Sequence, residues 1–300
     1  CIGTQCGIAP GYKIRGDILR KTFSIISLGI ILLVVGAVSS CQKTPPSSTE
    51  PRLVVLSPEV AEIIAALGAE DQIVGLTQEC DFPPQLSKIK KVGNFGLVDR
   101  EAVIALKPDM IFTSSLEHDA LAQEFSKLGY TVHQIYPRSV RDISHAVTHI
   151  GEKIGRVAEA NSLARELEGK IEELRRRSEG KPRPRVYMEI YRDPLMSVSD
   201  ASYVGDLIET AGGNNVFDVL ERDYCRIDAE DVVAAKPDII ICYSQETLQT
   251  ILNRKGWQDI PAIRNKRVYF EKDINPDWMQ RATPRAILGM ERLRELLDTF

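Results

Sequence analysis

The sequence has little of what nucleic-acid binding or the transport of bare metal ions requires. Its 300 residues contain 38 Lys and Arg against 42 Asp and Glu, a formal net charge of −4. The cationic residues are scattered among acids, so nucleic acid is not an expected partner. Only four histidines are present, without a dense acidic cluster. The chain therefore lacks the ligands expected of a zinc or manganese carrier.

One pair of histidines, His145 and His149, does have the i,i+4 spacing of a helical metal site. The apolar stripe predicted for the same helix lies on the opposite face and consists of Ile143, Val147, Ile150 and Ile154. We therefore expect both histidines to face solvent, and we predict no metal site.

Signatures of common enzymes are also absent. The sequence contains no G-x-S-x-G elbow, no G-x-x-x-x-G-K-[ST] phosphate loop and no H-E-x-x-H metal pair. We predict that the chain is not an enzyme and has no catalytic residues. Because an α/β fold can carry less common active sites, an extracytoplasmic enzyme stays open as a distant alternative, which would need a nucleophile and a base within reach of each other.

What the sequence does contain is a segment that occurs twice in similar form. Residues 99–111 read D-R-E-A-V-I-A-L-K-P-D-M-I, and residues 228–240 read D-A-E-D-V-V-A-A-K-P-D-I-I. The spacing is much longer than the roughly 20 to 50 residues of solenoid repeats, so it predicts two related lobes. A hydrophobic content of 43% is sufficient for two cores. A cleft between such lobes is where a ligand would bind.

The first 40 residues have the order of an export signal. Arg20-Lys21 precedes an apolar run from Phe23 to Val38, and small residues lead into Cys41. The run is shorter than the roughly 20 apolar residues of a spanning helix. The stretch 38–41, V-S-S-C, resembles the lipobox of bacterial lipoproteins, which implies that Cys41 is lipidated and becomes the mature N-terminus. An uncleaved N-terminal anchor is the alternative.

The segments on either side of this signal are expected to be unstructured or non-native. Residues 1–17 match no signal peptide and the chain lacks an initiating Met, so we expect translation to start near Ile18 or Leu19. Residues 41–51 are polar and rich in Pro and Ser, which predicts a lipid-anchored tether. Folded structure is expected to begin near Arg52.

The cysteine count leaves an odd number once Cys41 is lipidated. Of the mature cysteines, Cys242 ends the apolar run 239–241 and is expected in the core. Cys80 and Cys225 lie in polar stretches and could be reactive, paired or tolerated. One disulfide at most is possible.

Apolar runs that alternate with helix signals predict an N-terminal lobe over residues 52–156. Residues 53–56 read as a buried parallel strand, and Ser57-Pro58 then provides an N-cap and a first helical residue. Further strands are expected at 73–76, 110–112 and 132–135, and helices at 100–106 and 120–128. Strands alternating with helices indicate a parallel, doubly covered sheet.

The C-terminal lobe, residues 181–300, repeats this scheme. Strands are expected at 186–190 and 268–270, a helix at 203–211, and a last helix with Thr283 as cap and Pro284 in its first position. Between the lobes, residues 157–180 predict one linking helix with a stripe formed by Leu163, Leu167, Ile171 and Leu174.

The predicted fold class is therefore α/β, with two Rossmann-like lobes that have parallel sheets and are joined by one long α-helix. A helical connector makes a stiff hinge, so we expect only a small change in lobe angle on ligand binding.

Together, two such lobes, a long linking helix and a lipoprotein signal resemble the helical-backbone (class III) substrate-binding proteins of ABC importers, which carry cobalamin, ferric siderophores or haem. The stretches that carry the likeness are G-L-T-Q-E-C-D-F-P-P at 75–84, A-L-K-P-D at 105–109 and N-P-D-W-M-Q-R-A-T-P-R at 275–285. The likeness covers about residues 52–298. The D-F-P-P and D-W-x-x-R-A-T-P-R stretches are most similar to the cobalamin-binding members.

The resemblance implies that one glutamate on each lobe docks into arginine pockets of the membrane permease. The matching positions are Glu101 and Glu230. From the residues alone, each lies in the first turn of a helix behind a possible cap, Asp99 or Asp228, where an acid gains up to about 1 kcal/mol from the helix dipole without any partner. Docking and capping are compatible.

The predicted ligand-binding residues are aromatic residues in loops that follow strands, because ligands of open α/β sheets bind beyond the carboxyl ends of the strands. Broad aromatic faces suit a large flat macrocycle. The candidates are Phe82, Phe95, Tyr191, Tyr224 and Trp278.

Phe95 and Tyr224 precede Glu101 and Glu230 by the same number of residues, which suggests symmetric positions beside the cleft. In cobalamin-binding relatives a Trp stands in the place of Phe95, and each aromatic residue could instead serve packing.

Arginines beside these aromatics are candidates for an anionic ligand group, since guanidinium binds carboxylate or phosphate bidentately. Arg281 is the ligand candidate, whereas Arg285 is expected to be a solvated first-turn residue. Arg192, at the end of a strand, has a similar ambiguity.

The resemblance therefore implies an extracytoplasmic, membrane-anchored lipoprotein that captures a corrinoid, cobalamin, in the cleft and delivers it to an ABC permease and its ATPase. The same role for a ferric siderophore or haem is the alternative, and a structural or adhesion lipoprotein is a third class. No resident cofactor is expected, and the protein is expected to be a monomer. Genes for a permease and an ATPase beside its own would favour the importer role.

Overall fold

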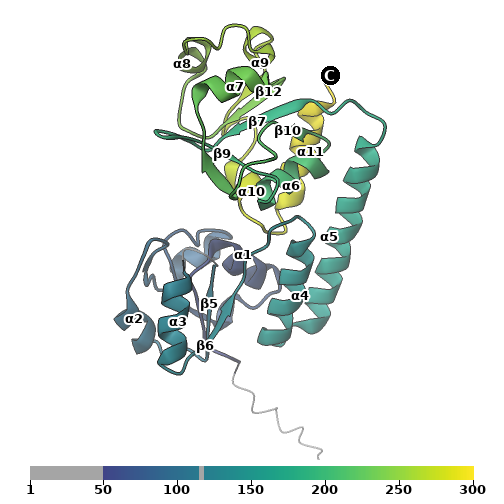
Figure 1. Ribbon diagram of the computed structural model, residues 1–300. Coiled ribbons are helices and arrows are strands. Elements are labelled where there is room, and N and C mark those ends of the chain that lie inside the picture. The colour runs from purple at the N-terminus through teal and green to yellow at the C-terminus, as the bar shows by residue number, and fades with distance from the viewer. Residues whose placement is uncertain (1–49, 115–117) are drawn as a thin grey trace, which may run out of the picture. The chain divides into compact units, whose positions relative to one another are not determined.

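Two parallel sheets, each of four strands, form the centres of two lobes. Figure 1 shows the two lobes in the computed structural model. The structure describes residues 50–114 and 118–300, and residues 49–300 form one compact unit. The predicted signal segment 1–40 and Cys41 lie outside the described residues. Within the described ranges, every helix is too short or too polar to span a bilayer. The predicted α/β fold class with two lobes and a linking helix is confirmed.

The N-terminal sheet has the strand order β2-β1-β5-β6, with all neighbours parallel. Its central strand β1 is fully buried because Leu53, Val54 and Val55 are apolar on both faces. The strands are β1 (Leu53–Val55), β2 (Ile73–Leu76), β5 (Met110–Thr113) and β6 (Thr131–Gln134), with a short hairpin of β3 (Gly93–Asn94) and β4 (Leu97–Val98). The helices are α1 (Pro58–Ala66), α2 (Arg100–Ala105), α3 (Asp119–Lys127) and α4 (Asp142–Ile154), with 3₁₀ turns η1 (Glu70–Gln72) and η2 (Pro84–Lys88).

The C-terminal sheet has the order β10-β7-β12-β13 and is also parallel. A second, antiparallel sheet β11-β9-β8 lies beside it and was not predicted, because its strands are too short to show a clear period. The strands are β7 (Arg185–Glu189), β8 (Tyr191–Arg192), β9 (Leu195–Val198), β10 (Asn214–Asn215), β11 (Tyr224–Arg226), β12 (Ile239–Cys242) and β13 (Val268–Tyr269). The helices are α6 (Tyr203–Thr210), α7 (Ala229–Ala235), α8 (Leu248–Leu252), α9 (Pro261–Arg264), α10 (Pro276–Gln280) and α11 (Ala286–Leu297).

The repeated sequence phrase forms the same backbone structure in both lobes. Lys107 follows α2 and Lys236 follows α7, each with a left-handed φ of 47°. The aspartate two positions later accepts a hydrogen bond from a backbone N–H at the start of the neighbouring parallel strand: Asp109 from Arg52, just before β1, at 2.8 Å, and Asp238 from Arg185, the first residue of β7, at 2.9 Å. The K-P-D motif therefore ties each repeated helix to the central strand of its sheet.

Helix α1 begins at the capping residue predicted from the sequence, whereas the last helix begins later than predicted. Ser57 caps α1 as predicted, its Oγ accepting from the Val60 N–H at 3.4 Å. The last helix, α11, begins at Ala286 and not at Pro284. The Thr283 Oγ1 accepts from Arg285 N and the Thr283 carbonyl from Ala286 N, so residues 283–285 form a turn before the helix.

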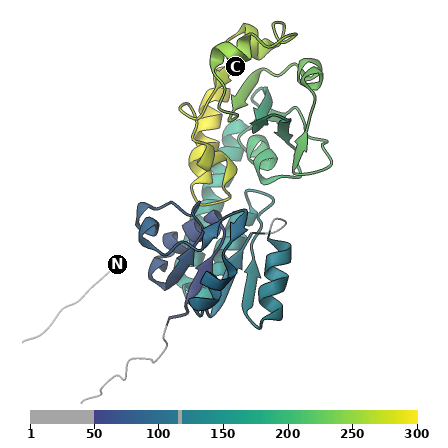
Figure 2. The same ribbon diagram turned by 90° about the vertical axis from the view of Figure 1, so that its left-hand side faces the viewer.

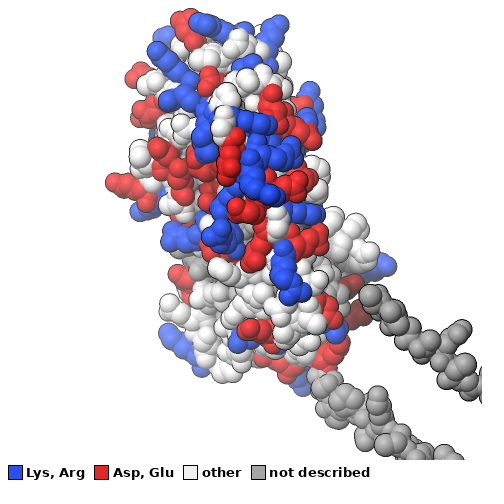
Figure 3. All heavy atoms as spheres, turned by 90° about the vertical axis from the view of Figure 1, so that its right-hand side faces the viewer, with Lys and Arg blue, Asp and Glu red and all other residues white. Residues whose placement is uncertain are grey.

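The linking helix α5 (Val157–Ser178) extends from one lobe to the other, with α4 beside it in Figure 1. Figure 2 shows the two lobes from the left-hand side of Figure 1. It packs against α4 from the N-terminal lobe and against α6 and α11 from the C-terminal lobe. Of its predicted stripe, Leu163 is partly buried, and Leu167, Ile171 and Leu174 are buried. Figure 3 shows acidic and basic side chains interspersed on the face of the molecule that carries α5. One face of the connector is therefore fixed to both lobes.

The largest buried apolar cluster crosses the junction between the lobes. It includes Ile63 and Val147 from the N-terminal lobe and Ile171 from the linking helix. From the C-terminal lobe it includes Ile208 and Met290. The two lobes and the connector therefore share one continuous apolar core.

Candidate ligand-binding site and docking surfaces

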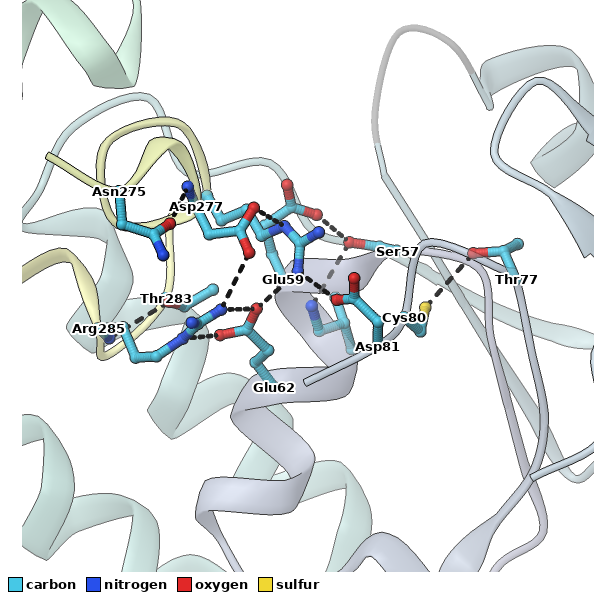
Figure 4. Close-up of polar contacts among 12 residues, drawn as sticks. Ser57, Glu59, Glu62, Thr77, Cys80, Asp81, Asn275, Asp277, Thr283 and Arg285 are labelled. Atoms are coloured by element: carbon cyan, nitrogen blue, oxygen red, sulfur yellow. Dashed lines mark hydrogen bonds and ion pairs between the residues drawn. The ribbon is translucent and has the colours of Figure 1, made fainter. Parts of the chain in front are cut away.

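Residues that follow strands of both sheets meet at the lobe junction, and a buried carboxylate lies at their centre. Glu62, on α1 just after β1, is only 4% exposed. Arg285 donates to it from Nε at 2.8 Å and from Nη2 at 2.6 Å, and Arg281 donates from Nη1 at 3.1 Å. Figure 4 shows Arg285 and Glu62 pointing toward each other. Two guanidinium groups of the C-terminal lobe thus share one carboxylate of the N-terminal lobe.

Two further acids complete this cluster. Asp81 accepts from Arg281 at 2.9 Å, and Asp277 lies 3.2 Å from Arg281 and 3.8 Å from Arg285. Burial acts to lower the pKa of Arg281, but hydrogen bonds to Asp81 and Glu62 outweigh it and raise the pKa above its ordinary value. Arg281 therefore stays charged, and both arginines are engaged within the protein.

Phe82 lies at the edge of the same cluster. The guanidinium of Arg285 stacks over its ring at 3.7 Å from the centroid. The expectation that Arg285 is a solvated first-turn residue is wrong: its side chain is 17% exposed and paired with Glu62, because the turn at 283–285 directs it toward the N-terminal lobe.

A second set of contacts joins the lobes through Asp223. Its carboxylate accepts from the Tyr136 hydroxyl at 2.6 Å and from Arg138 at 3.1 Å. Nearby, the backbone N–H of Val140 donates to Asp206 on α6 at 2.7 Å. The lobes are therefore held together on both sides of the junction.

Between these contacts lies a small polar cavity of about 60 Å³. This volume is well below the roughly 300–1,000 Å³ of typical small-molecule sites. Both lobes contribute to its wall, which is formed by Glu59, Ser114, Ile135, Tyr136, Pro137, Tyr203, Tyr224, Gln280 and Ala282. Among the described residues, this wall contains one acid and no cation. Tyr224, one of these lining residues, is 38% exposed.

The predicted ligand residues are divided among several places. Tyr224 lines the cavity, and Phe82 and Arg281 belong to the cluster around Glu62. Tyr191 on β8 is 56% exposed, and Trp278 on α10 is half-buried. Their roles toward a ligand stay predictions.

Phe95 packs within its own lobe. Its ring stacks on His118 with centroids 4.6 Å apart, and its backbone N–H donates to Glu79 at 2.8 Å. The symmetric position suggested for Phe95 and Tyr224 therefore corresponds to different surroundings, since of this pair Tyr224 lines the cavity and Phe95 does not.

The sequence analysis did not identify several residues of the junction, chiefly Glu62, Glu59 and Tyr203. Glu62 did leave a signal, because it lies on the buried face of a predicted helix, where a charge requires a partner. Tyr203, the first residue of α6, carries no signal in the sequence beyond that of a helix start.

Arg192, whose role the sequence left open, is paired within the protein. Arg192 forms an ion pair with Glu246.

Cys80, Cys225 and Cys242 are free thiols, and Cys242 is buried in the core as expected. Burial raises the pKa of Cys80 to about 11, so this thiol is protonated and inert at neutral pH.

The two docking candidates occupy matching exposed positions. Glu101 lies in the first turn of α2, where Asp99 accepts from the Ala102 N–H at 3.0 Å. Glu230 lies in the first turn of α7 behind Asp228, whose N–H donates to Asp231 at 3.0 Å. Neither glutamate forms an ion pair with a described residue. Both carboxylates are thus available to a partner while other acids serve as caps.

The histidines of α4 lie where the sequence pattern puts them. The apolar stripe of this helix is buried, whereas His145 and His149 are exposed, as expected. Across residues 50–114 and 118–300, no group of three or more His, Cys, Asp or Glu side chains is arranged to hold a metal ion.

Comparison with known proteins agrees with this architecture. The chain is 26% identical over 246 residues to a vitamin B12-binding protein of Vibrio vulnificus (81% of this chain, 89% of the relative). It is 28% identical over 262 residues to the uncharacterized ABC transporter substrate-binding lipoprotein YvrC of Bacillus subtilis (84% and 82%). The crystal structure of the periplasmic vitamin B12-binding protein BtuF of Vibrio cholerae superposes with a TM-score of 0.74 at 22% identity (83% and 97%).

The sequence pattern of the periplasmic binding protein family matches residues 53–274. The relatives named above are binding proteins and not enzymes, in agreement with the absence of catalytic motifs. The chain belongs to the periplasmic binding protein family.

Proposed function

We propose that this protein is an extracytoplasmic, lipid-anchored binding protein that captures a corrinoid, cobalamin, at the lobe junction and delivers it to an ABC permease. The relatives support a solute-binding role in an ABC importer. The lipobox at Cys41 supports the anchor, and the exposed Glu101 and Glu230 support docking.

The choice of ligand in this proposal rests on the charge of the side chains at the junction. Haem presents two carboxylates, and such groups bind best to free cations. Here Arg281 and Arg285 are already paired with Glu62, Asp81 and Asp277, and the described residues of the cavity wall include an acid and no cation. The junction therefore favours a ligand whose periphery is uncharged and rich in hydrogen-bonding groups. A corrinoid rimmed with amide side chains fits this description.

The size of the cavity limits how such a ligand binds. A volume of about 60 Å³ accepts a few heavy atoms and excludes a macrocycle. In this proposal the ring lies at the mouth of the cavity, near Tyr224, or enters after a modest separation of the lobes.

Calorimetric titration of the purified protein with cyanocobalamin, haemin and a panel of ferric siderophores tests the proposal. Tight one-to-one binding of cyanocobalamin, with weaker or no binding of the anionic chelates, is expected. Binding of haemin or a ferric siderophore alone would keep the transport role and replace the ligand. Absence of binding throughout would contradict the proposed function.

A further inference from the structure

Tyr203 has a buried hydroxyl group without a partner among the described residues, and this residue lines the cavity at the lobe junction. The residue is 5% exposed, and its hydroxyl forms no hydrogen bond with a described residue. A buried polar group left unpaired is strongly disfavoured, so such groups usually have a protein, water or ligand partner. Tyr203 thus lines the cavity and carries a hydroxyl group that no described residue satisfies.

The surroundings of this hydroxyl make it a donor. Burial raises the pKa of Tyr203 well above its ordinary value, and the nearby Tyr224 and Glu59 add to the effect. The phenol is therefore protonated at neutral pH. A protonated phenol can donate its hydrogen to a carbonyl oxygen.

Glu59 supplies the complementary acceptor in the same cavity wall. Its Oε2 accepts from Ser57 Oγ at 2.7 Å, and a carboxylate has lone pairs for further donors. Gln280, which also lines the cavity, has an amide that both donates and accepts. Residues with donor and acceptor groups thus line one cavity of about 60 Å³.

We infer that this cavity is a subsite for one primary carboxamide of the ligand, with the Tyr203 hydroxyl donating to the amide carbonyl and the Glu59 carboxylate accepting from the amide NH₂. The inference rests on the proposed function, because the amide belongs to a side chain of a larger ligand at the cavity mouth. A carboxylate in the same place would be repelled by Glu59. The subsite therefore selects amide-bearing ligands over their acids.

Calorimetric titration of the purified protein tests this with cyanocobalamin and with its monocarboxylic acid derivatives, in each of which one peripheral amide is hydrolysed. The wild-type protein should bind one of these acids at least about tenfold more weakly than cyanocobalamin. Tyr203→Phe, which removes only the hydroxyl, should weaken cyanocobalamin binding about five- to thirtyfold. Glu59→Gln should reduce the discrimination against that acid.

Tyr187→Phe is the matched control, since Tyr187 is fully buried in the same lobe but its hydroxyl donates to Glu189 and does not line the cavity. This variant should bind cyanocobalamin as the wild type does. If cyanocobalamin binds tightly while Tyr203→Phe and Glu59→Gln change neither affinity nor discrimination, the subsite is refuted and the proposed function stands. If the wild type binds no corrinoid, both are refuted.

Discussion

Arg285 donates two hydrogen bonds to Glu62 across the lobe junction, at 2.8 and 2.6 Å. The residues belong to different lobes, and Arg281 shares the same carboxylate at 3.1 Å. Because Glu62 is buried, its carboxylate requires hydrogen-bonding cationic partners, and both arginines share it. The relative position of the lobes is thus linked to one ionised side chain.

Replacing Glu62 with Gln should destabilise the protein by about 3 kcal/mol, because two mostly buried guanidinium groups lose their shared counter-charge. The free energy of unfolding, measured by urea denaturation, provides the test. Asp81→Asn is the matched control: it changes the same cluster at a side chain that is 62% exposed, where an ion pair contributes less than about 1 kcal/mol. Equal effects of the two substitutions would contradict a dominant role for Glu62.

Two glycines on the α4–α5 hairpin should respond to alanine in opposite directions. A Cβ at Gly151 would lie 2.3 Å from the Cβ of Ala160, so Gly151→Ala should force α4 away from α5 and destabilise the protein by about 1–3 kcal/mol. A Cβ at Gly169 would have no described atom within 4 Å, and Gly169→Ala should stabilise α5 by about 0.5–1 kcal/mol. Thermal unfolding of both variants measures the difference, and a gain for Gly151→Ala would show that the two helices are not closely packed.

Stability should fall as the pH rises from about 9 to 11, partly because of Cys80. The folded protein raises the pKa of this thiol from 9.0 to about 11, so the protonated form favours folding below pH 9 and this contribution disappears as the pH passes the folded value. The loss from this group is at most about 3 kcal/mol. Urea denaturation at several pH values should show a shallower decline for Cys80→Ala.

Cys225→Ala serves as the control for this pH dependence, since Cys225 lies outside the core and is only partly buried. It should reproduce the wild-type decline. If the free energy of unfolding of Cys80→Ala falls with pH as steeply as that of the wild type, other groups cause the loss of stability at alkaline pH. The buried Tyr187, Tyr203 and Tyr243 are such groups, because burial also raises their pKa values.

The double variant Glu101→Ala with Glu230→Ala should abolish ligand uptake in cells while leaving the affinity for ligand nearly unchanged. Both side chains are exposed and lie on α2 and α7, and neither is among the described residues that line the cavity. Uptake of labelled ligand and calorimetry on the purified protein separate the two effects. Glu168→Ala with Glu173→Ala, two exposed acids on α5, should leave uptake intact. A parallel loss of affinity in the first variant would argue against docking.

The local structure could be predicted from the sequence because its causes are local. The apolar run at 53–55 specified a buried strand, Ser57-Pro58 specified the start of α1, and the repeated K-P-D phrase indicated two similar lobes. The linking helix followed from the regular spacing of Leu167, Ile171 and Leu174. Each of these features depends on neighbours within a few residues, or on burial that the apolar pattern itself implies.

Only the tertiary structure decided which polar side chains meet. Glu62 and Arg285 are distant in sequence, and nothing in either local pattern shows that they pair. The assignment of Arg285 to solvent was wrong for that reason. Likewise, Tyr203 and Glu59 come from different lobes and share a cavity only because the fold brings the first turns of α1 and α6 to one junction. Hydrophobic burial follows a sequence period, whereas a specific ion pair or an unpaired hydroxyl depends on the exact placement of distant elements.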